Sequence, residues 1–341
     1  MRAIVYSENG PSSVLRLVDR PVPEPGFGEV RVRLLRAGVN PTDQKMRAGL
    51  SATLAFPEVT PGQDGAGVVD AMGEGVGGLG FGDDVWLYLA QDNRPYGTAA
   101  EYVVVPADRA VRLPSRGGDP AIHDLGASLG VPAMTAHRAL TAGELTSRLG
   151  PGTMAGQTVL VQGGAGAVGN AAIQLARWSG AKVITTVSSD EKATLATAAG
   201  ADACVNYRQG DPVAEVRDLA PDGVDLVVEV APALNNDLDR AVTRQRATIA
   251  IYANNGGDQL TMPLRETFSR NLRYQFVLLY TVGPDLLAAA AEDIAAALAD
   301  GALRAGEEAG LPLHHYPLEE TAAAHDAVEA GVVGKVLIDL A

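Results

Sequence analysis

The glycine-rich turn Gly163-Gly164-Ala165-Gly166-Ala167-Val168-Gly169 follows an apolar run at residues 158–162 and precedes a segment with helical spacing at residues 168–179. A second apolar run, residues 181–187, comes directly after that segment. This order of strand, glycine turn, helix and strand is typical of a dinucleotide-binding unit, because glycine permits the tight turn and the close approach of a pyrophosphate. The N–H groups at the helix start would bind the phosphate oxygens.

The alternation of strands and helices continues after residue 187. The pattern predicts helices at residues 190–199 and 213–219, and strands at residues 203–206, 224–230, 247–252 and 272–280. Strands that alternate with helices of this length indicate a parallel, doubly wound sheet. The sequence therefore predicts an α/β domain built around the glycine turn.

The first third of the chain predicts a small, closed β domain. Turns rich in Gly, Pro and Asp separate short β-rich runs at residues 2–6, 29–39, 65–71, 84–89 and 100–105. The chain has 341 residues, which is enough for two domains. An Ala-rich helix at residues 284–300 and a closing strand at 335–340 have no place in the parallel sheet, so we expect the tail to return to the β domain. The predicted domains are residues 1–124 with 285–341, and residues 125–284.

Composition narrows the range of partners. A net charge of −14 makes the average surface repel nucleic acids and anionic lipids, so neither is an expected partner. The single cysteine, Cys204, allows no internal disulfide and points to a reducing compartment. The first ten residues lack the apolar core of a signal peptide. We expect a soluble, cytoplasmic protein.

The end of the second strand predicts which dinucleotide is bound. NAD enzymes usually place a carboxylate there to hold the ribose 2′-hydroxyl, but this strand ends in Val187-Ser188-Ser189. Asp190-Glu191 follow as first-turn helix residues, which a serine cap and the helix dipole favour. Lys192 lies where a 2′-phosphate would bind, with Ser188 beside it and Tyr207 after the third strand. We therefore predict NADPH; the alternative for Lys192 is a solvated surface charge.

Several further segments resemble those of the zinc-independent quinone oxidoreductases, the zeta-crystallin-like family of the medium-chain dehydrogenase/reductase superfamily. The matching segments run almost from end to end of the chain: Gly38-Val39-Asn40-Pro41-Thr42-Asp43, Pro61-Gly62-Gln63-Asp64-Gly65-Ala66-Gly67, Gly82-Asp83-Asp84-Val85, Gly97-Thr98-Ala99-Ala100-Glu101-Tyr102, Thr135-Ala136-His137, the glycine turn, Asn206-Tyr207-Arg208 and Gly334-Lys335-Val336. Their combined spacing is specific to this family.

The resemblance implies a GroES-like β domain joined to a Rossmann domain, with NADPH as cofactor. Carried over by position, Asn40 and Thr135 would face the nicotinamide half, and Tyr252 is a further expected cofactor-binding residue. The turn from Gly163 to Gly169 would hold the pyrophosphate, chiefly through Gly166, Ala167 and Val168. Ser188, Lys192 and Tyr207 would hold the 2′-phosphate, and Lys335 lies in the C-terminal cofactor-contact segment. The alternative for Lys335 is a charge at a strand edge.

The residues near the expected active site do not favour a metal. Zinc dehydrogenases of the superfamily carry cysteine and histidine near the positions of Asn40 and Gln63, and neither of these amides is a usual zinc ligand. We therefore expect no metal, and an acceptor that is already electrophilic. The predicted activity is NADPH-dependent reduction of a quinone, with Asn40 and Gln63 orienting the acceptor or carboxamide. The proton would come from water or from a pocket hydroxyl such as Tyr252 or Tyr280.

Other functions are compatible with the same residues. An NADPH-dependent enone or enoyl reductase needs the same cofactor and acceptor pocket, and a non-enzymatic NADPH-binding protein needs only the cofactor site. The sequence also departs from the family at Lys45, where an aromatic residue is usual, and in the long connection at residues 141–157. The strand at residues 272–280 would end the sheet, so we expect it to form a homodimer seam.

Overall fold

A computed structural model describes residues 1–51, 53–114 and 120–340 of the chain. Contacts divide this described chain into two compact units. Unit 1 comprises Met1–Val131 and Pro312–Ala341, and unit 2 comprises Pro132–Leu311. One boundary falls within helix α2 (Pro120–Leu140), beside the proline that the helix contains.

The sheet of unit 2 is parallel throughout its described residues. Its six strands lie in the order β10-β9-β8-β11-β12-β13. They are β8 (Thr158–Gln162), β9 (Lys182–Val187), β10 (Ala203–Asn206), β11 (Val224–Glu229), β12 (Thr243–Ile251) and β13 (Arg273–Phe276). Numbered along the chain, the strands have the order 3-2-1-4-5-6 of a Rossmann sheet, in which the order of strands reverses between β8 and β11 while all strands stay parallel. The predicted doubly wound α/β domain is confirmed.

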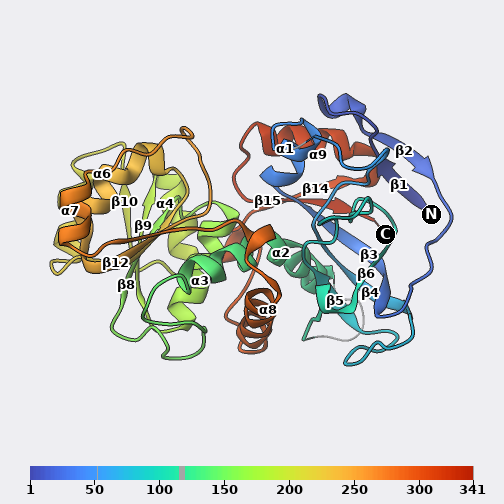
Figure 1. Cartoon of the computed structure of the whole chain (residues 1–341), viewed down its shortest axis with the longest axis horizontal. Helices are drawn as coiled ribbons and strands as arrows, with labels where there is room; N and C mark the ends of the chain where they lie inside the picture. The colour runs from blue at the N-terminus through green and yellow to red at the C-terminus, as the bar shows by residue number, and fades with distance from the viewer. Residues whose placement is uncertain (52, 115–119, 341) are drawn as a thin grey trace. The chain divides into compact units, whose positions relative to one another are not determined.

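Helices connect these strands and cover the sheet (Figure 1). They are α3 (Ala167–Trp178), α4 (Asp190–Ala198), α5 (Pro212–Leu219), α6 (Pro232–Val242) and α7 (Leu264–Ser269), whereas α8 (Pro284–Ala299) follows β13, the last strand of this sheet. Helix α3 packs on β8 and β9, whereas α5 and α6 pack together over a buried core that includes Ile184, Val216 and Val227. The covered sheet leaves the carboxyl ends of β8 and β9 as the place where ligands bind in this fold.

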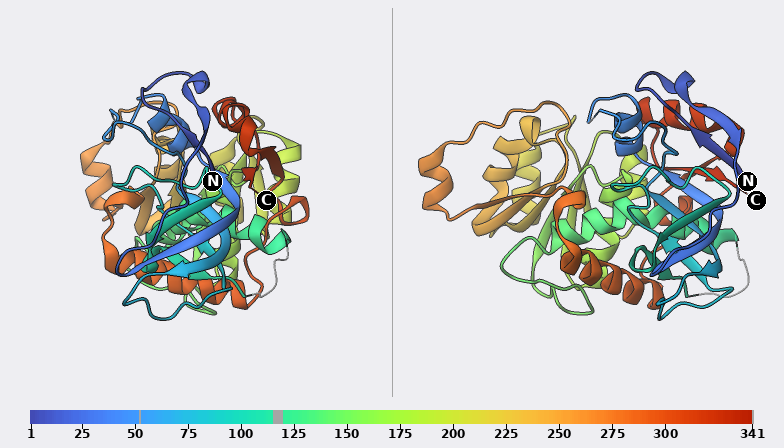
Figure 2. Two further views of the ribbon diagram at one scale, coloured as in Figure 1. Left: turned by 90° about the vertical axis from the view of Figure 1, so that its right-hand side faces the viewer. Right: turned by 45° about the vertical axis from the view of Figure 1, so that its right-hand side comes forward.

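Unit 1 is built mainly from antiparallel strands. Its larger sheet has the order β14-β15-β3-β4-β5-β7, with β6 also paired to β3. The elements of unit 1 are β1 (Arg2–Val5), β2 (Arg16–Asp19), β3 (Glu29–Val39), α1 (Pro41–Arg47), β4 (Asp64–Met72), β5 (Asp84–Leu87), β6 (Tyr102–Pro106), β7 (Ala110–Arg112), β14 (Leu313–Pro317), α9 (Thr321–Glu329) and β15 (Lys335–Asp339). Strand β15 pairs antiparallel with β3, so the C-terminal tail lies among N-terminal strands (Figure 2), as predicted.

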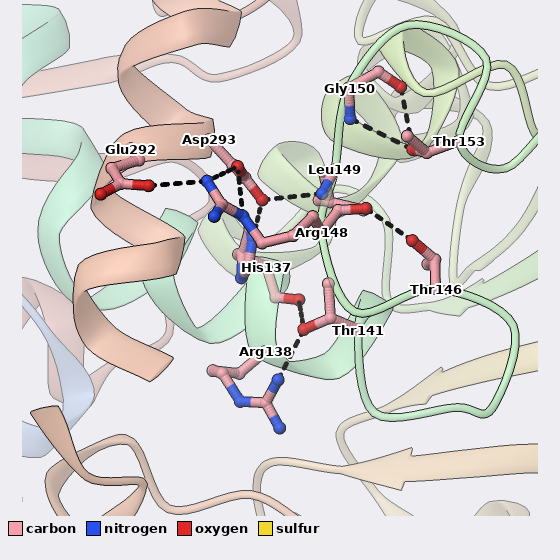
Figure 3. A network of polar contacts seen from close by, with 10 residues as sticks. All are labelled: His137, Arg138, Thr141, Thr146, Arg148, Leu149, Gly150, Thr153, Glu292 and Asp293. Carbon is pink, nitrogen blue, oxygen red and sulfur yellow. Dashed lines mark hydrogen bonds and ion pairs between the residues drawn. The ribbon is translucent and has the colours of Figure 1, made fainter. Parts of the chain in front are cut away.

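Helix α8 belongs to unit 2, whereas the predicted domains placed residues 285–311 with the β domain. The contacts of Asp293 account for this position. Its Oδ2 lies 2.8 Å from Nε2 of His137 and accepts 2.7 Å from the Leu149 backbone N–H, while Nη2 of Arg148 donates 2.6 Å to Oδ1 (Figure 3). The long connection at residues 141–157 is therefore hydrogen-bonded to α8 through Arg148 and Leu149. The predicted division of the chain into a catalytic and an NADPH-binding domain remains a prediction.

Strand β13 is shorter than the predicted strand at residues 272–280. It ends at Phe276, which pairs with Ile251, the last residue of β12. Beyond Ile251 the neighbouring strand offers no further residues, so the chain turns into the 3-10 turn Leu279–Thr281. The sequence also did not predict the helices α1, α2, α6, α7 and α9. None of the helices in the described chain combines the length and the apolar run that a membrane span requires.

Candidate functional site

The glycine turn of unit 2 has the shape of a phosphate-binding cradle. Gly163 has a φ of 72°, in the left-handed region that favours glycine, and Gly166 is the N-cap of α3. A Cβ on Gly169 would lie 2.4 Å from the carbonyl oxygen of Gly163, so the helix approaches the turn too closely for a side chain. The first helical hydrogen bond runs from the N–H of Asn170 to Gly166, which leaves the N–H groups of the first turn available to an anion.

A hydroxyl and a cation meet at the end of β9. Nζ of half-buried Lys192 donates 3.0 Å to Oγ of Ser188, the residue that follows β9. Tyr207 lies next to this strand end, because its N–H donates 3.1 Å to the carbonyl of Val187, and its side chain is 49% exposed. Ser189 caps α4, and Glu191 lies in the first turn of that helix as predicted. The structure thus brings together the predicted 2′-phosphate residues.

A buried polar chain runs beneath the carboxyl ends of the sheet. Gln162 accepts from the hydroxyl of Thr186 and donates 2.7 Å to Oδ1 of Asp239. Burial, and then the charge of neighbouring Glu229, raise the pKa of Asp239 well above its usual value. Glu229 itself accepts from the N–H of Ala231. Sequence reasoning missed these residues, although Glu229, an acidic residue in the apolar run at residues 226–231, was a usable signal.

Two predicted residues of unit 2 lie apart from the phosphate residues. Tyr252 follows β12, and its N–H donates 3.0 Å to the carbonyl of Glu229. Burial of the phenol and the charge of Glu229 raise the pKa of Tyr252, so its hydroxyl stays protonated at neutral pH. Thr135 is 6% exposed and lies within α2.

The site residues of unit 1 form a closed ring of contacts. Asn40 caps α1, Asp64 begins β4 and Lys335 begins β15. Nζ of Lys335 donates 2.7 Å to Oδ1 of Asn40 and lies 3.1 Å from Oδ2 of Asp64, while Nδ2 of Asn40 donates 2.7 Å to the same carboxylate oxygen. A buried ammonium, carboxylate and carboxamide therefore satisfy one another. The sequence predicted Asn40 and Lys335 as site residues, but it did not predict that Asp64 contacts both of them.

Two further polar residues lie beside this ring. Oδ2 of Asp43 accepts 2.8 Å from the N–H of Asn40. Burial, and then the charge of Asp64, raise the pKa of Asp43 to about 7. Gln63 is fully buried; its Oε1 accepts 3.2 Å from the N–H of Gln91, and its Nε2 has no partner among the described residues. An unpaired buried N–H is a donor that a bound ligand could satisfy.

The donors at this place do not fit a zinc ion. Asn40 and Gln63 are amides, and the carboxylate of Asp64 is already paired with the ammonium of Lys335, whose positive charge would repel a metal. The histidines of the described chain are engaged elsewhere or isolated, and no group of three or more potential metal ligands occurs among the described residues.

Comparison with known proteins agrees with this architecture. Residues 26–115 match the alcohol dehydrogenase GroES-like domain, and residues 167–296 match the zinc-binding dehydrogenase model. A GroES-like unit and a Rossmann unit in one chain define the medium-chain dehydrogenase/reductase superfamily. The quinone oxidoreductase of Lama guanicoe is 30% identical, covering 99% of this chain and 97% of that protein. The chain belongs to the quinone oxidoreductase family of this superfamily.

Solved structures show the same fold across the whole chain. The crystal structure of an NAD-dependent alcohol dehydrogenase is 32% identical, with a TM-score of 0.85 and complete coverage of both chains. A mycobacterial protein complexed with NADPH is 29% identical, with a TM-score of 0.80 and 99% coverage of each chain. An NAD-dependent enzyme and a protein complexed with NADPH are therefore both similar to this chain, so the choice of coenzyme rests on the residues of the chain itself.

Proposed function

We propose that the protein is an NADPH-dependent oxidoreductase that reduces quinones without a zinc ion. The buried ammonium of Lys335, 2.7 Å from Asn40 and 3.1 Å from Asp64, carries this proposal. Zinc dehydrogenases carry metal ligands near the position of Asn40. In this protein a lysine cation lies beside that residue. The domain that holds this ring, predicted as residues 1–124 with 285–341, would be the GroES-like catalytic domain, and residues 125–284 would be the NADPH-binding domain.

Without a Lewis acid, the enzyme requires an acceptor that is already electrophilic. When bound, NADPH supplies the hydride. A quinone that takes up a hydride becomes a quinolate, and one proton from water or from the Tyr252 hydroxyl completes the hydroquinone. Asn40 and Gln63 each have an N–H available to orient the acceptor or the nicotinamide carboxamide.

The preference for NADPH rests on the end of β9. Lys192 and Ser188 form a cation and hydroxyl pair there, and Tyr207 lies next to the strand end. A phosphate group would gain charge-assisted hydrogen bonds from this pair. The pyrophosphate would bind at Gly166, Ala167 and Val168. Thr135, Tyr252 and Asn40 would contact the nicotinamide half, and Lys335 would belong to the C-terminal cofactor-contact segment.

The acceptor can be tested directly. We expect oxidation of NADPH by 1,4-benzoquinone to be faster, in kcat/KM, than oxidation by methyl vinyl ketone. Faster reduction of the enone would replace the quinone reductase with an enone reductase. Tight binding of NADPH without turnover on either acceptor would leave only a binding protein.

We also propose a cytoplasmic homodimer. Strand β13 is an edge strand; Phe276, its last residue, is 61% exposed, and Leu278, which follows it, is 59% exposed. Such an edge can pair with its copy in a second subunit. The half-buried, unpaired Cys204 suits a reducing compartment. Sedimentation equilibrium should give twice the mass of the chain, and a monomer at micromolar concentration would refute the dimer.

A further inference from the structure

The carboxamide of Asn40 is held on both of its polar atoms. Lys335 donates to its oxygen and Asp64 accepts from its nitrogen, each at 2.7 Å. The exposed fractions are 3% for Asn40, 2% for Lys335 and 0% for Asp64. At such burial water cannot replace either partner. The two contacts together therefore fix the orientation of the side-chain amide, that is, the direction in which its NH2 group points.

The partners of Asn40 are themselves held firmly. Oδ1 of Asp64 accepts 2.7 Å from the N–H of Val131, and a Cβ on neighbouring Gly130 would lie 2.1 Å from that oxygen. A Cβ on Gly38 would lie 2.8 Å from Cε of Lys335 and 2.9 Å from its Nζ. Glycines at both places therefore give the carboxylate and the ammonium the space that they need. The ion pair is built into β4, β15 and α2 rather than resting on a flexible surface.

We propose that Lys335 and Asp64 are positioning residues that orient the Asn40 amide for hydride transfer. The amide has two N–H hydrogens, and one is bound to Asp64. The other is the donor that Asn40 presents to an oxygen of the acceptor or of the nicotinamide carboxamide. If the ammonium is lost, the amide can rotate and present its oxygen, which repels those ligand oxygens. This inference rests on the proposed function, because it assumes that Asn40 takes part in that reaction.

The test compares Lys335→Met with Lys182→Met. Lys182 is an exposed lysine on β9 that donates to the carbonyl of Leu219, so it controls for removal of a lysine. We expect Lys335→Met to lower kcat with 1,4-benzoquinone by about 10- to 100-fold, the effect of losing one charge-assisted hydrogen bond. The isotope effect with NADPH deuterated at the transferred position should rise, because hydride transfer becomes slower than product release. Lys182→Met should change neither quantity.

A folded Lys335→Met variant with wild-type kcat and isotope effect would overturn the positioning role. A loss of kcat that follows only the folded fraction, with an unchanged isotope effect, would also overturn it. A double variant, Lys335→Gln with Asp64→Asn, covers the case in which the single variant does not fold. It keeps hydrogen-bonding groups without burying a lone charge, and we expect it to recover part of the lost kcat. A folded double variant with wild-type kcat and isotope effect would show that the charges do not position Asn40.

A second measurement does not depend on turnover. The side-chain amide resonance of Asn40, assigned in nitrogen-15-labelled protein by its loss in Asn40→Ser, should shift in Lys335→Met and stay in place in Lys182→Met. An unchanged resonance in Lys335→Met would refute the positioning of the Asn40 amide by Lys335, even if the wild-type protein reduced no quinone. If the wild-type protein shows no turnover but the resonance shifts, the proposed reaction is refuted and the positioning of Asn40 is retained.

Discussion

The ammonium of Lys192 lies 3.0 Å from the hydroxyl of Ser188, directly beyond the last residue of β9. If this pair binds the 2′-phosphate, Lys192→Ala should lower kcat/KM for NADPH by about 10- to 100-fold and leave kcat/KM for NADH nearly unchanged. Steady-state kinetics with both coenzymes measures the ratio. Lys182→Ala, an exposed lysine in β9, is the matched control. An equal loss with both coenzymes would show that Lys192 does not select the phosphate.

The closeness of α3 to the glycine turn predicts the effect of one methyl group. In Gly169→Ala the new Cβ would meet the carbonyl oxygen of Gly163 at 2.4 Å, which forces the backbone to move. We expect the free energy of unfolding to fall by about 1–3 kcal/mol, and NADPH to bind more weakly. Urea denaturation and coenzyme fluorescence measure the two effects. Gly77→Ala adds a methyl group where no other atom lies within 4 Å, so it should change neither.

The buried carboxyl group of Asp239 makes stability depend on pH. Its pKa is raised in the folded state by burial and by Glu229, so the folded state retains a proton that the unfolded chain releases above its usual pKa. The stabilisation is complete at acid pH, and it is lost as the pH rises. Asp239→Asn has no such proton, and its amide can still accept from Gln162. Relative to wild type, the variant should therefore gain stability as the pH rises above the usual pKa of aspartate, by roughly 1.4 kcal/mol per pH unit at most.

Urea denaturation at several pH values tests this prediction, with the exposed Asp222→Asn as control. Parallel pH profiles of wild type and Asp239→Asn would mean that Asp239 is ionised in the folded protein.

Asp293 should contribute more to stability than its neighbour Glu292. Asp293 is 5% exposed and is bound to His137, Arg148 and Leu149, whereas Glu292 reaches only the Arg148 side chain at 2.8 Å among the described residues. We expect Asp293→Ala to lower the free energy of unfolding by about 3–5 kcal/mol and Glu292→Ala by about 0–1 kcal/mol. The histidine and arginine contacts hold the pKa of Asp293 at about 2 against its burial, so the stabilisation should disappear only as the pH falls below the usual range for aspartate. Equal losses in the two variants would mean that the buried network adds nothing.

Local patterns were sufficient to predict the Rossmann sheet. The strands of unit 2 are short apolar runs, and the glycine turn gives their register relative to α3, so neighbouring residues carry the signal. The helix α1 was missed because it is short and begins at Asn40-Pro41, which also matches a loop motif. Strand β13 was predicted too long because its end depends on Ile251 of another strand.

The candidate site was predicted only in part, for a related reason. Lys192 and Ser188 are four residues apart, across the junction of β9 and α4, so their pairing could be predicted from the local sequence. Asp64 and Lys335 are separated by 271 residues, so no local pattern could reveal their contact. Asp239 meets Gln162 across 77 residues and was missed for the same reason. Contacts within one local segment could be predicted, whereas contacts that tertiary folding makes could not, although the family resemblance marked Asn40 and Lys335 as site residues.

The most direct test of the account is the rate of quinone-dependent NADPH oxidation by chelator-treated protein, with zinc content measured in the same sample. We predict full activity with far less than one zinc per chain, because Lys335 provides the buried cation beside Asn40 and Asp64. Activity that vanishes on chelation and returns with stoichiometric zinc would contradict the account.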